Sequence, residues 1–207
     1  MFVKHDYSYS REKALELLRG IAKKYSIDLQ SPSYIKSRSL VNTTFDEYEG
    51  FSFIEKAEFA FLVPTSVSRG TESNWEAVQS FFPVLEHAKA HEAYDFFTKI
   101  PPARMEMYGG KGQEASGVLV FVPVFSDMLQ DYRAKFFLKR EVIRRVNDTV
   151  LFVKMKFGVK YVGLGATLPK ITSYGRDIKV SGVSVTTGHA GTVWLVREIV
   201  KKLVDER

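Results

Sequence analysis

The sequence predicts an α/β fold, with a mostly parallel sheet and helices on both of its faces. Short apolar runs at 58–64, 117–125, 161–164 and 183–185 are typical of strands that are buried on both faces. Helical patterns separate most of these runs, so strands and helices are expected to alternate as βαβ units. The 207 residues are 45% hydrophobic and 26% charged, which suits one large domain with a well-filled core.

An extra helical element is predicted before this α/β region. Ser10 is a suitable N-cap for a helix that ends near Tyr25, and Leu15, Leu18 and Ala22 fall on one face of it. Residues 28–49 predict a second short helix or an irregular arm. We therefore expect an N-terminal helical extension over 1–54 and an α/β domain over 55–207.

The segment between the first two predicted strands combines helices with a loop. Asn74 is a candidate cap for a helix that starts at Trp75, and a further helix is predicted over 84–98. Residues 108–117 contain four glycines and are expected to form a flexible loop. His87 and His91 have the i, i+4 spacing of metal ligands, but no third ligand is near them in the sequence. Surface histidines are the favoured interpretation, and no metal site is predicted.

A long helix with a basic face is predicted from Ser126 or Asp127 to Phe157, with Gly158 as its C′ residue. Its predicted core face consists of Leu129, Phe136, Phe137, Ile143, Val146, Val150 and Val153. Between Arg133 and Lys156 there are eight basic residues against two acidic ones, so the rest of the chain is close to neutral. The predicted basic face consists of Lys139, Arg140, Arg144 and Arg145. This face is either solvated or a docking site for an acidic partner.

The chain after 161 carries the best candidates for a binding crevice. Two apolar runs there are each followed by small and hydroxylated residues, and open α/β sheets bind ligands at the carboxyl ends of their strands. The candidate substrate-binding residues are Gly163, Gly165, Thr167, Lys170, Thr186, Thr187, Gly188, His189 and Thr192, with Thr172 and Gly191 of similar character. Alternatively, the glycines serve turns and the threonines cap helices.

Residues 163–168 (GLGATL) invite comparison with a dinucleotide-binding loop, but Leu168 replaces the third glycine and Pro169 follows. A tight strand-to-loop turn is the favoured interpretation. By contrast, 186–189 (TTGH) precedes a predicted helix over 190–204, whose first N–H groups are candidates to bind a carbonyl oxygen or a phosphate. His189 is suited either to polarise a carbonyl or to act as a neutral hydrogen-bonding residue. No nucleophile stands out, so no catalytic residue is predicted.

In their order along the chain, the segments SGVLVFVPVFSDML, VKYVGLGATLPKIT and VSVTTGHAGTVWLVREIV resemble the amino-terminal half of the long-chain acyl-[acyl-carrier-protein] reductases, which make fatty aldehydes. FAFLVPTSVSRG and FFTKIPPARM are similar to segments further upstream in that family, so the resemblance spans 58–200. It implies a substrate-side domain that binds a fatty acyl thioester. It also implies that an acyl carrier protein docks on the basic helix.

Two parts of that family have no counterpart in the sequence. The dinucleotide-binding domain and the nucleophilic cysteine are missing, because the chain ends at Arg207 and contains no cysteine. We therefore expect the chain alone to be inactive and to bind no cofactor. NADP is expected only if a separate dinucleotide-binding domain, in cis or in trans, completes the enzyme.

Composition also narrows the location and the other possible functions. No run of about 18 apolar residues predicts a membrane span, residues 1–5 lack the apolar part of a secretion signal, and cysteine is absent, so a cytoplasmic protein is expected. The net charge of +6 permits a non-catalytic basic binding module, but no nucleic-acid motif accompanies the basic helix. The substrate domain of a different NAD(P)-dependent reductase is a further alternative.

Overall fold

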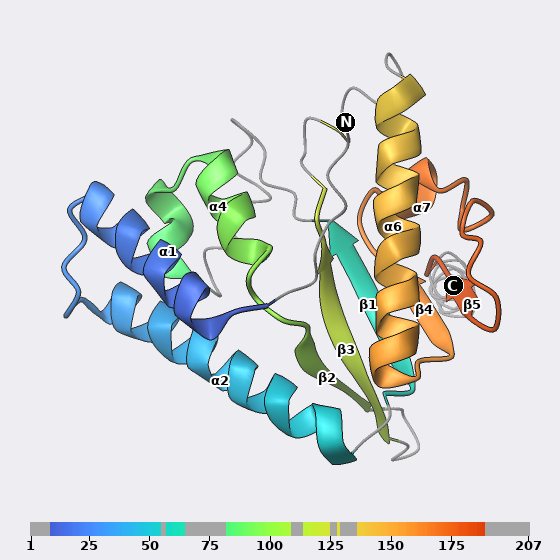
Figure 1. Ribbon diagram of the computed structural model, residues 1–207, viewed down its shortest axis with the longest axis horizontal. Coiled ribbons are helices and arrows are strands. Elements are labelled where there is room, and N and C mark those ends of the chain that lie inside the picture. The colour runs from blue at the N-terminus through green and yellow to red at the C-terminus, as the bar shows by residue number, and fades with distance from the viewer. Residues whose placement is uncertain are drawn as a thin grey trace, which may run out of the picture.

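The computed structural model describes residues 9–54, 57–64, 82–108, 114–124, 128 and 136–188. It confirms the predicted α/β class, with helices around a five-stranded, mostly parallel sheet of order β2-β3-β1-β4-β5 (Figure 1). The strands are β1 (Phe59–Pro64), β2 (Ala103–Tyr108), β3 (Glu114–Val122), β4 (Tyr161–Leu164) and β5 (Ser184–Thr186). β1 is parallel to β3 and β4, and β4 is parallel to β5, whereas β2 pairs antiparallel with β3.

Helix α6 (Phe136–Phe157) covers one face of this sheet. Its buried Val142, Val146, Val150 and Val153 pack with Ala60, Leu62, Val118, Val120, Val122, Val162 and Leu164 in one core. The short helix α7 (Leu168–Ile171) adds two fully buried side chains to the same core. Gly158, with φ of +70°, ends α6 in the left-handed conformation, as predicted.

The predicted core face of α6 is wrong at the start of the helix. Phe136 and Phe137 are 72% and 54% exposed, because the first turns of α6 extend past the carboxyl ends of the strands (Figure 1). Val146, Val150 and Val153 do lie in the core, as predicted. The predicted cap at Ser126 or Asp127 and the predicted core residue Leu129 lie outside the described residues.

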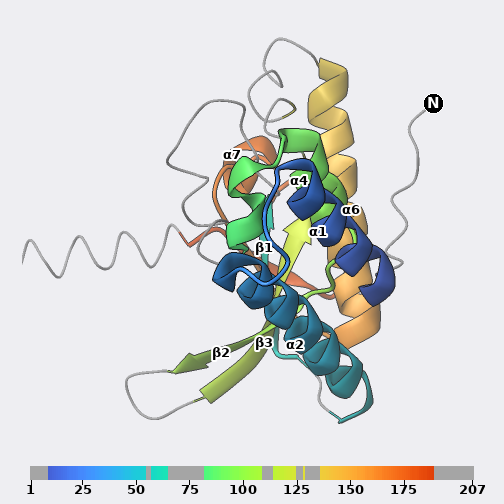
Figure 2. The ribbon, with the colours of Figure 1, turned by 90° about the vertical axis from the view of Figure 1, so that its left-hand side faces the viewer.

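A helical lobe lies beside the sheet (Figures 1 and 2). It contains α1 (Arg11–Lys24), α2 (Pro32–Ile54), the 3-10 helix η1 (Pro83–His87) and α4 (Ala90–Phe97). α1 begins at the predicted cap, where the N–H of Lys13 donates to Ser10 Oγ at 3.3 Å. These four helices share a second hydrophobic core, so the lobe combines residues from both sides of position 54. The domain boundary at this position stays a prediction.

Helix α2 is longer than the short helix or irregular arm that was expected there. Its buried stripe alternates apolar Tyr34, Val41 and Phe45 with the hydroxyls of Ser37 and Thr44. Ser37 Oγ donates to the carbonyl of Ser33 at 2.9 Å, and Thr44 Oγ1 donates to that of Leu40 at 2.8 Å. Polar residues therefore interrupt the apolar pattern without breaking the helix, because the helix itself satisfies them.

Two other expectations between β1 and α6 need correction. The single helix predicted over 84–98 is two helices, because Ala88 and Lys89 are extended and Glu92 starts α4 by accepting from the N–H of Lys89 at 2.8 Å. The loop predicted over 108–117 includes the end of β2 and the start of β3, which pair in an antiparallel hairpin. Three further segments lie outside the described residues: 109–113, the helix expected from Trp75 and the helix expected over 190–204.

Candidate functional site

The predicted crevice residues lie where β4 and β5 end. The two strands are adjacent and parallel, and Gly163 is the register partner of Thr186. The segments that follow the strands therefore start from the same edge of the sheet, as the sequence predicted. Thr167, Lys170, Thr186 and Gly188 are exposed there, and Thr187 is half-buried. His189, Gly191 and Thr192 lie outside the described residues.

Two of the predicted site glycines have a packing role. A Cβ on Gly163 would lie 2.8 Å from Cδ2 of Phe61. A Cβ on Gly165 would lie 2.9 Å from Cζ of the same ring and 3.0 Å from Cγ1 of Val63. These glycines therefore make room for Phe61. Gly188 differs, because its φ of +73° favours glycine and no atom of the described residues would crowd a side chain there.

The threonines of the crevice also differ in role. Thr172 is buried, and its Oγ1 donates to the carbonyl of Leu168 at 2.8 Å and accepts from the N–H of Gly175 at 3.2 Å, so it stabilises the turn after α7. Thr167 occupies the N-cap position of α7 without a side-chain capping bond. Thr186 Oγ1 accepts a long bond of 3.4 Å from the N–H of Gly188. Thr167 and Thr186 are thus the better candidates to contact a ligand.

The segment between α7 and β5 lies beside this edge and is stabilised by side-chain hydrogen bonds. Ser173 and Tyr174 both have positive φ, a strained conformation for residues with a side chain. Asp177 stabilises this turn by accepting from Ser173 Oγ at 2.7 Å. Asn147 joins this segment to α6. Its Nδ2 donates to the carbonyl of Asp177 at 3.0 Å, and its Oδ1 accepts from the N–H of Lys179 at 2.7 Å.

Two of the four predicted partner-binding cations have internal partners. Arg144 donates to both carboxylate oxygens of Glu141, at 3.0 and 2.7 Å, and to Asp148 at 2.8 Å. Arg145 donates to Glu141 Oε1 at 2.7 Å, to the hydroxyl of Tyr94 at 2.9 Å and to the carbonyl of Pro123 at 2.6 Å. Arg145 thus connects α6 to the end of β3 and to α4.

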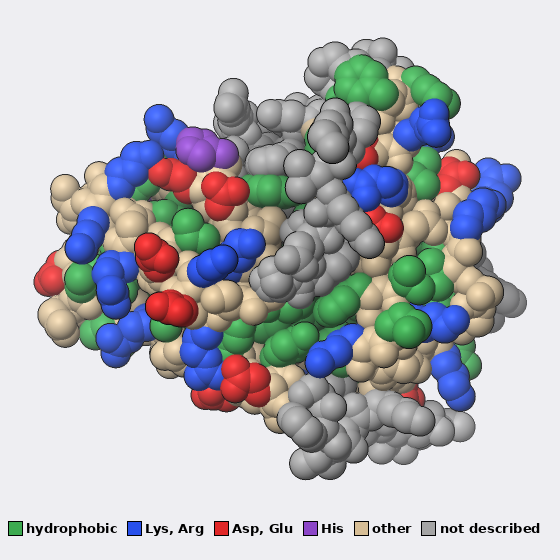
Figure 3. Space-filling view, viewed as in Figure 1, with side chains coloured by type: hydrophobic (Ala, Val, Ile, Leu, Met, Phe, Trp, Pro, Cys, Tyr) green, Lys and Arg blue, Asp and Glu red, His purple; other side chains and the backbone are tan. Residues whose placement is uncertain are grey.

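The side chain of Glu141 is only 3% exposed, and its carboxylate binds both guanidinium groups. Burial alone would raise the pKa of Glu141, but the hydrogen bonds from Arg144 and Arg145 outweigh burial and leave this pKa below its ordinary value. The basic face of α6 is accordingly interrupted by acidic side chains (Figure 3). Lys139 and Arg140 have no acidic partner among the described residues, and the Arg140 guanidinium lies 5.9 Å from the centre of the Phe136 ring.

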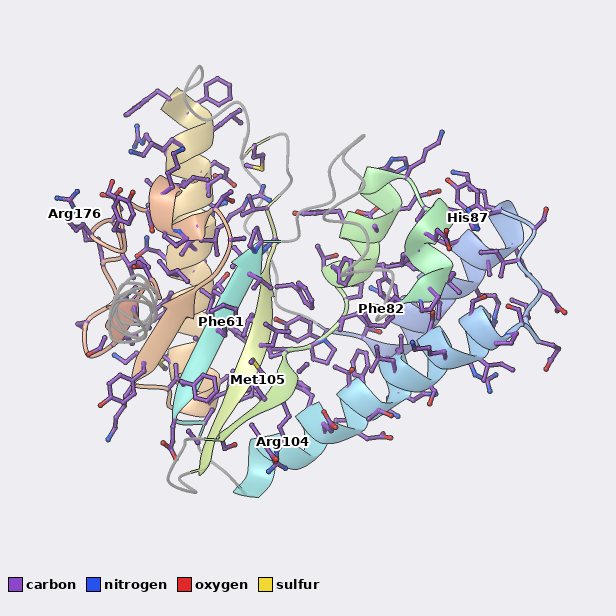
Figure 4. All side chains as sticks on the ribbon, turned by 180° about the vertical axis from the view of Figure 1, so that it is seen from behind. Phe61, Phe82, His87, Arg104, Met105 and Arg176 are labelled. Carbon is purple, nitrogen blue, oxygen red and sulfur yellow. The ribbon has the colours of Figure 1, made fainter. Side chains whose placement is uncertain are left out.

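Sequence reasoning missed the second face of the sheet. Phe59, Phe61, Val63, Leu119 and Met105 are half-buried and belong to neither of the two cores formed by the described residues. We call these five residues the phenylalanine face. Figure 4 shows the molecule from the back of Figure 1 and labels Phe61 and Met105 of this face. The sequence does show strands that are rich in phenylalanine and strands that contain glycine. It does not show that these strands pair, so this face could not be identified from the sequence.

The helical lobe carries a separate open groove of about 700 Å³ between α1 and α4. Its lining includes Lys13, Glu16, Gly20, Asp95 and Lys99, so it mixes charges of both signs. Within the described ranges, no three His, Asp or Glu side chains are grouped so that they could bind a metal. No helix in the described part of the chain is long and apolar enough to cross a membrane.

Comparison with models of protein families gives no match, and a search of curated proteins gives no significant match. Function is therefore inferred from the arrangement of the side chains.

Proposed function

We propose that the protein binds a long-chain fatty acyl thioester at the sheet edge formed by the carboxyl ends of β4 and β5. One observation carries the proposal: Thr186 and Gly163, which are register partners at this edge, continue directly into the half-buried phenylalanine face. A thioester offers a carbonyl oxygen to hydrogen-bond donors and an apolar tail to a hydrophobic surface. Ligand sites commonly combine a mainly apolar lining with a few polar groups in this way.

The donors for the carbonyl oxygen come from the threonines at this edge. Among the described residues, the hydroxyl of Thr186 accepts one long bond from the N–H of Gly188, which leaves its own hydrogen available to a ligand. Thr167, which makes no capping bond, is the second donor, and the ammonium of the exposed Lys170 follows one turn later. Each of these groups orients the thioester and none serves as a nucleophile.

The proposed role is to hold and orient the acyl thioester. The sequence contains no cysteine that could take over the acyl group. Reduction of the thioester with NADP would require a dinucleotide-binding domain, in cis or in trans. The same architecture would also serve the substrate side of a different NAD(P)-dependent reductase, and titration with other carbonyl ligands distinguishes these two cases.

An acyl carrier protein is the proposed donor of the ligand. The first turns of α6 extend beyond the carboxyl ends of the strands, the edge at which the thioester is proposed to bind (Figure 1). Lys139 and Arg140 lie on these turns and would face an acidic partner. Charge complementarity of this kind mainly speeds association and orients the encounter. A basic module for nucleic acid has less support, because Arg144 and Arg145 already have internal partners.

Calorimetric titration with a hexadecanoyl thioester tests the proposal. The parent protein should bind it, and Thr186→Val should weaken binding by about tenfold, which corresponds to the loss of one hydrogen bond. Thr43→Val, a change at an exposed threonine on α2, is the matched control and should leave the affinity unchanged. Absence of binding by the parent well above micromolar concentration would contradict the proposed function.

A further inference from the structure

We infer that the acyl tail of the ligand lies across the phenylalanine face, on the side of the sheet opposite α6. This inference rests on the proposed function and adds the position and direction of the tail. It assigns a ligand-binding role to Phe59, Phe61 and Leu119. The predicted crevice residues would then contact the thioester alone.

The strand register gives the path of the tail. One row of directly paired residues crosses all five strands: Thr186, Gly163, Phe61, Leu119 and Ala103. Neighbouring strands are about 4.8 Å apart, so the four steps of this row span roughly 19 Å. If the thioester carbonyl binds at Thr186, the row is therefore long enough for a long acyl tail to lie along it.

The rows on this face are uncharged. The neighbouring row contains Ser184, Tyr161, Phe59, Gly117 and Met105. Arg104 and Glu106 alternate with Ala103 and Met105 along β2, so their side chains leave from the other face, where they pair with each other at 3.1 Å. An alkyl chain on this surface would therefore displace no counter-charge and desolvate no ion.

Glycines let the two aromatic rings lie down on the sheet. A Cβ on Gly117 would lie 2.5 Å from Cζ of Phe59, so this ring reaches over β3. The Phe61 ring leans the other way, over Gly163 of β4 and over Gly165, which directly follows this strand. The rings fill the places of the missing side chains, which produces an even apolar surface where ridges of side chains would otherwise stand. Such a surface suits a flexible alkyl chain.

A second copy of the chain and another segment of the same chain are the alternative occupants of this face. The acyl tail is favoured because the apolar row ends at the hydroxyl of Thr186, where the thioester is proposed to bind. A protein segment on this face would have no need of a polar group at that end of the row.

The test compares hexadecanoyl and butanoyl thioesters on the full chain. Leu119→Ser should weaken the hexadecanoyl ligand by about tenfold and leave the butanoyl ligand within about twofold, because Leu119 lies three strands from Thr186 and only the long tail reaches it. Phe61→Ser should also weaken the hexadecanoyl ligand by about tenfold. Thr186→Val should weaken both ligands by the same factor. Gly163→Ala should act like Phe61→Ser, because the added Cβ forces the Phe61 ring off the sheet.

The outcomes separate the two proposals. If the parent binds neither thioester, the proposed function fails and the inference fails with it. If the parent binds the hexadecanoyl ligand and the Phe61, Leu119 and Gly163 variants bind it equally well, only the inference is overturned. The ligand-free variants supply a second measurement. Phe61→Ser should lower Tm much less than Leu62→Ala, and an equal loss, or a change from dimer to monomer in sedimentation, would assign the face to protein packing.

Discussion

The two faces of β1 differ in how completely their side chains are buried. Ala60 and Leu62 point toward α6 and are fully buried, whereas Phe59, Phe61 and Val63 point the other way and are half-buried. On the α6 face, valines from neighbouring strands and from the helix fill the space between the layers. On the other face, large rings lie over glycines. The difference shows that a uniformly apolar strand can bury one of its faces completely and leave the other half-buried.

The largest expected effect comes from truncating one residue on each face. Leu62→Ala should lower the free energy of unfolding by about 3 kcal/mol, because it removes a fully buried side chain and leaves a cavity. Phe61→Ala should cost only about 1 kcal/mol, since the ring is half-buried and belongs to neither core. Urea denaturation of both variants measures the difference. A loss at Phe61 as large as that at Leu62 would show that both faces are packed interiors.

Much of this fold could be predicted from local patterns. The apolar runs located β1, β3, β4 and β5, and helical spacing located α1 and most of the described part of α6. Local patterns failed where packing decides the conformation. Strand β2 was not predicted, and residues 108 and 114–116, which pair in β2 and β3, were assigned to a loop because of the glycines around them.

The candidate site was predictable only in its position. The meeting of β4 and β5 at one edge follows from their order and direction, but the role of each residue depends on distant partners. Gly163 and Gly165 were predicted to approach a ligand, and their contact with Phe61 became visible only with the strand pairing. Arg145 was predicted to face a partner protein, although its guanidinium binds Tyr94, which is 51 residues away in the sequence.

Acid should destabilise the helical lobe beside the phenylalanine face. Burial alone would raise the pKa of Glu92, but hydrogen bonds from Lys24, the Lys89 N–H and Tyr25 lower it to about 2. Because this folded-state pKa lies below the unfolded value of about 4.3, Glu92 stabilises the lobe above that pH. Its contribution is lost as the pH falls toward about 2.

Glu92→Gln tests this pH dependence. At pH 6 the variant should melt about 2–4 °C below the parent, and the difference should shrink steadily below pH 4.3. Hydrogen exchange should place the loss in α1 and α4, which Glu92 joins, more than in α6. Glu86→Gln, a change at an exposed carboxylate of η1, is the control and should melt like the parent at every pH. A constant difference between Glu92→Gln and the parent would assign the effect to the lost hydrogen bonds and not to charge.

The smallest expected effect concerns the first turns of α6, where the half-buried Lys139 and the exposed Arg140 contrast with the paired arginines of the same helix. Lys139→Glu combined with Arg140→Glu should slow association with an acyl carrier protein by about fivefold, and the effect should fade as salt is added, because these cations have no acidic partner among the described residues. Arg145→Gln is the informative control: it removes a cation whose side chain is 18% exposed and bound to Glu141, so it should reduce stability and leave the association rate unchanged. Stopped-flow mixing at two salt concentrations measures both. Equal slowing by the two variants would mean that carrier docking depends on the integrity of α6 and not on the charges of Lys139 and Arg140. No slowing by either variant would leave this side of α6 as a solvated surface.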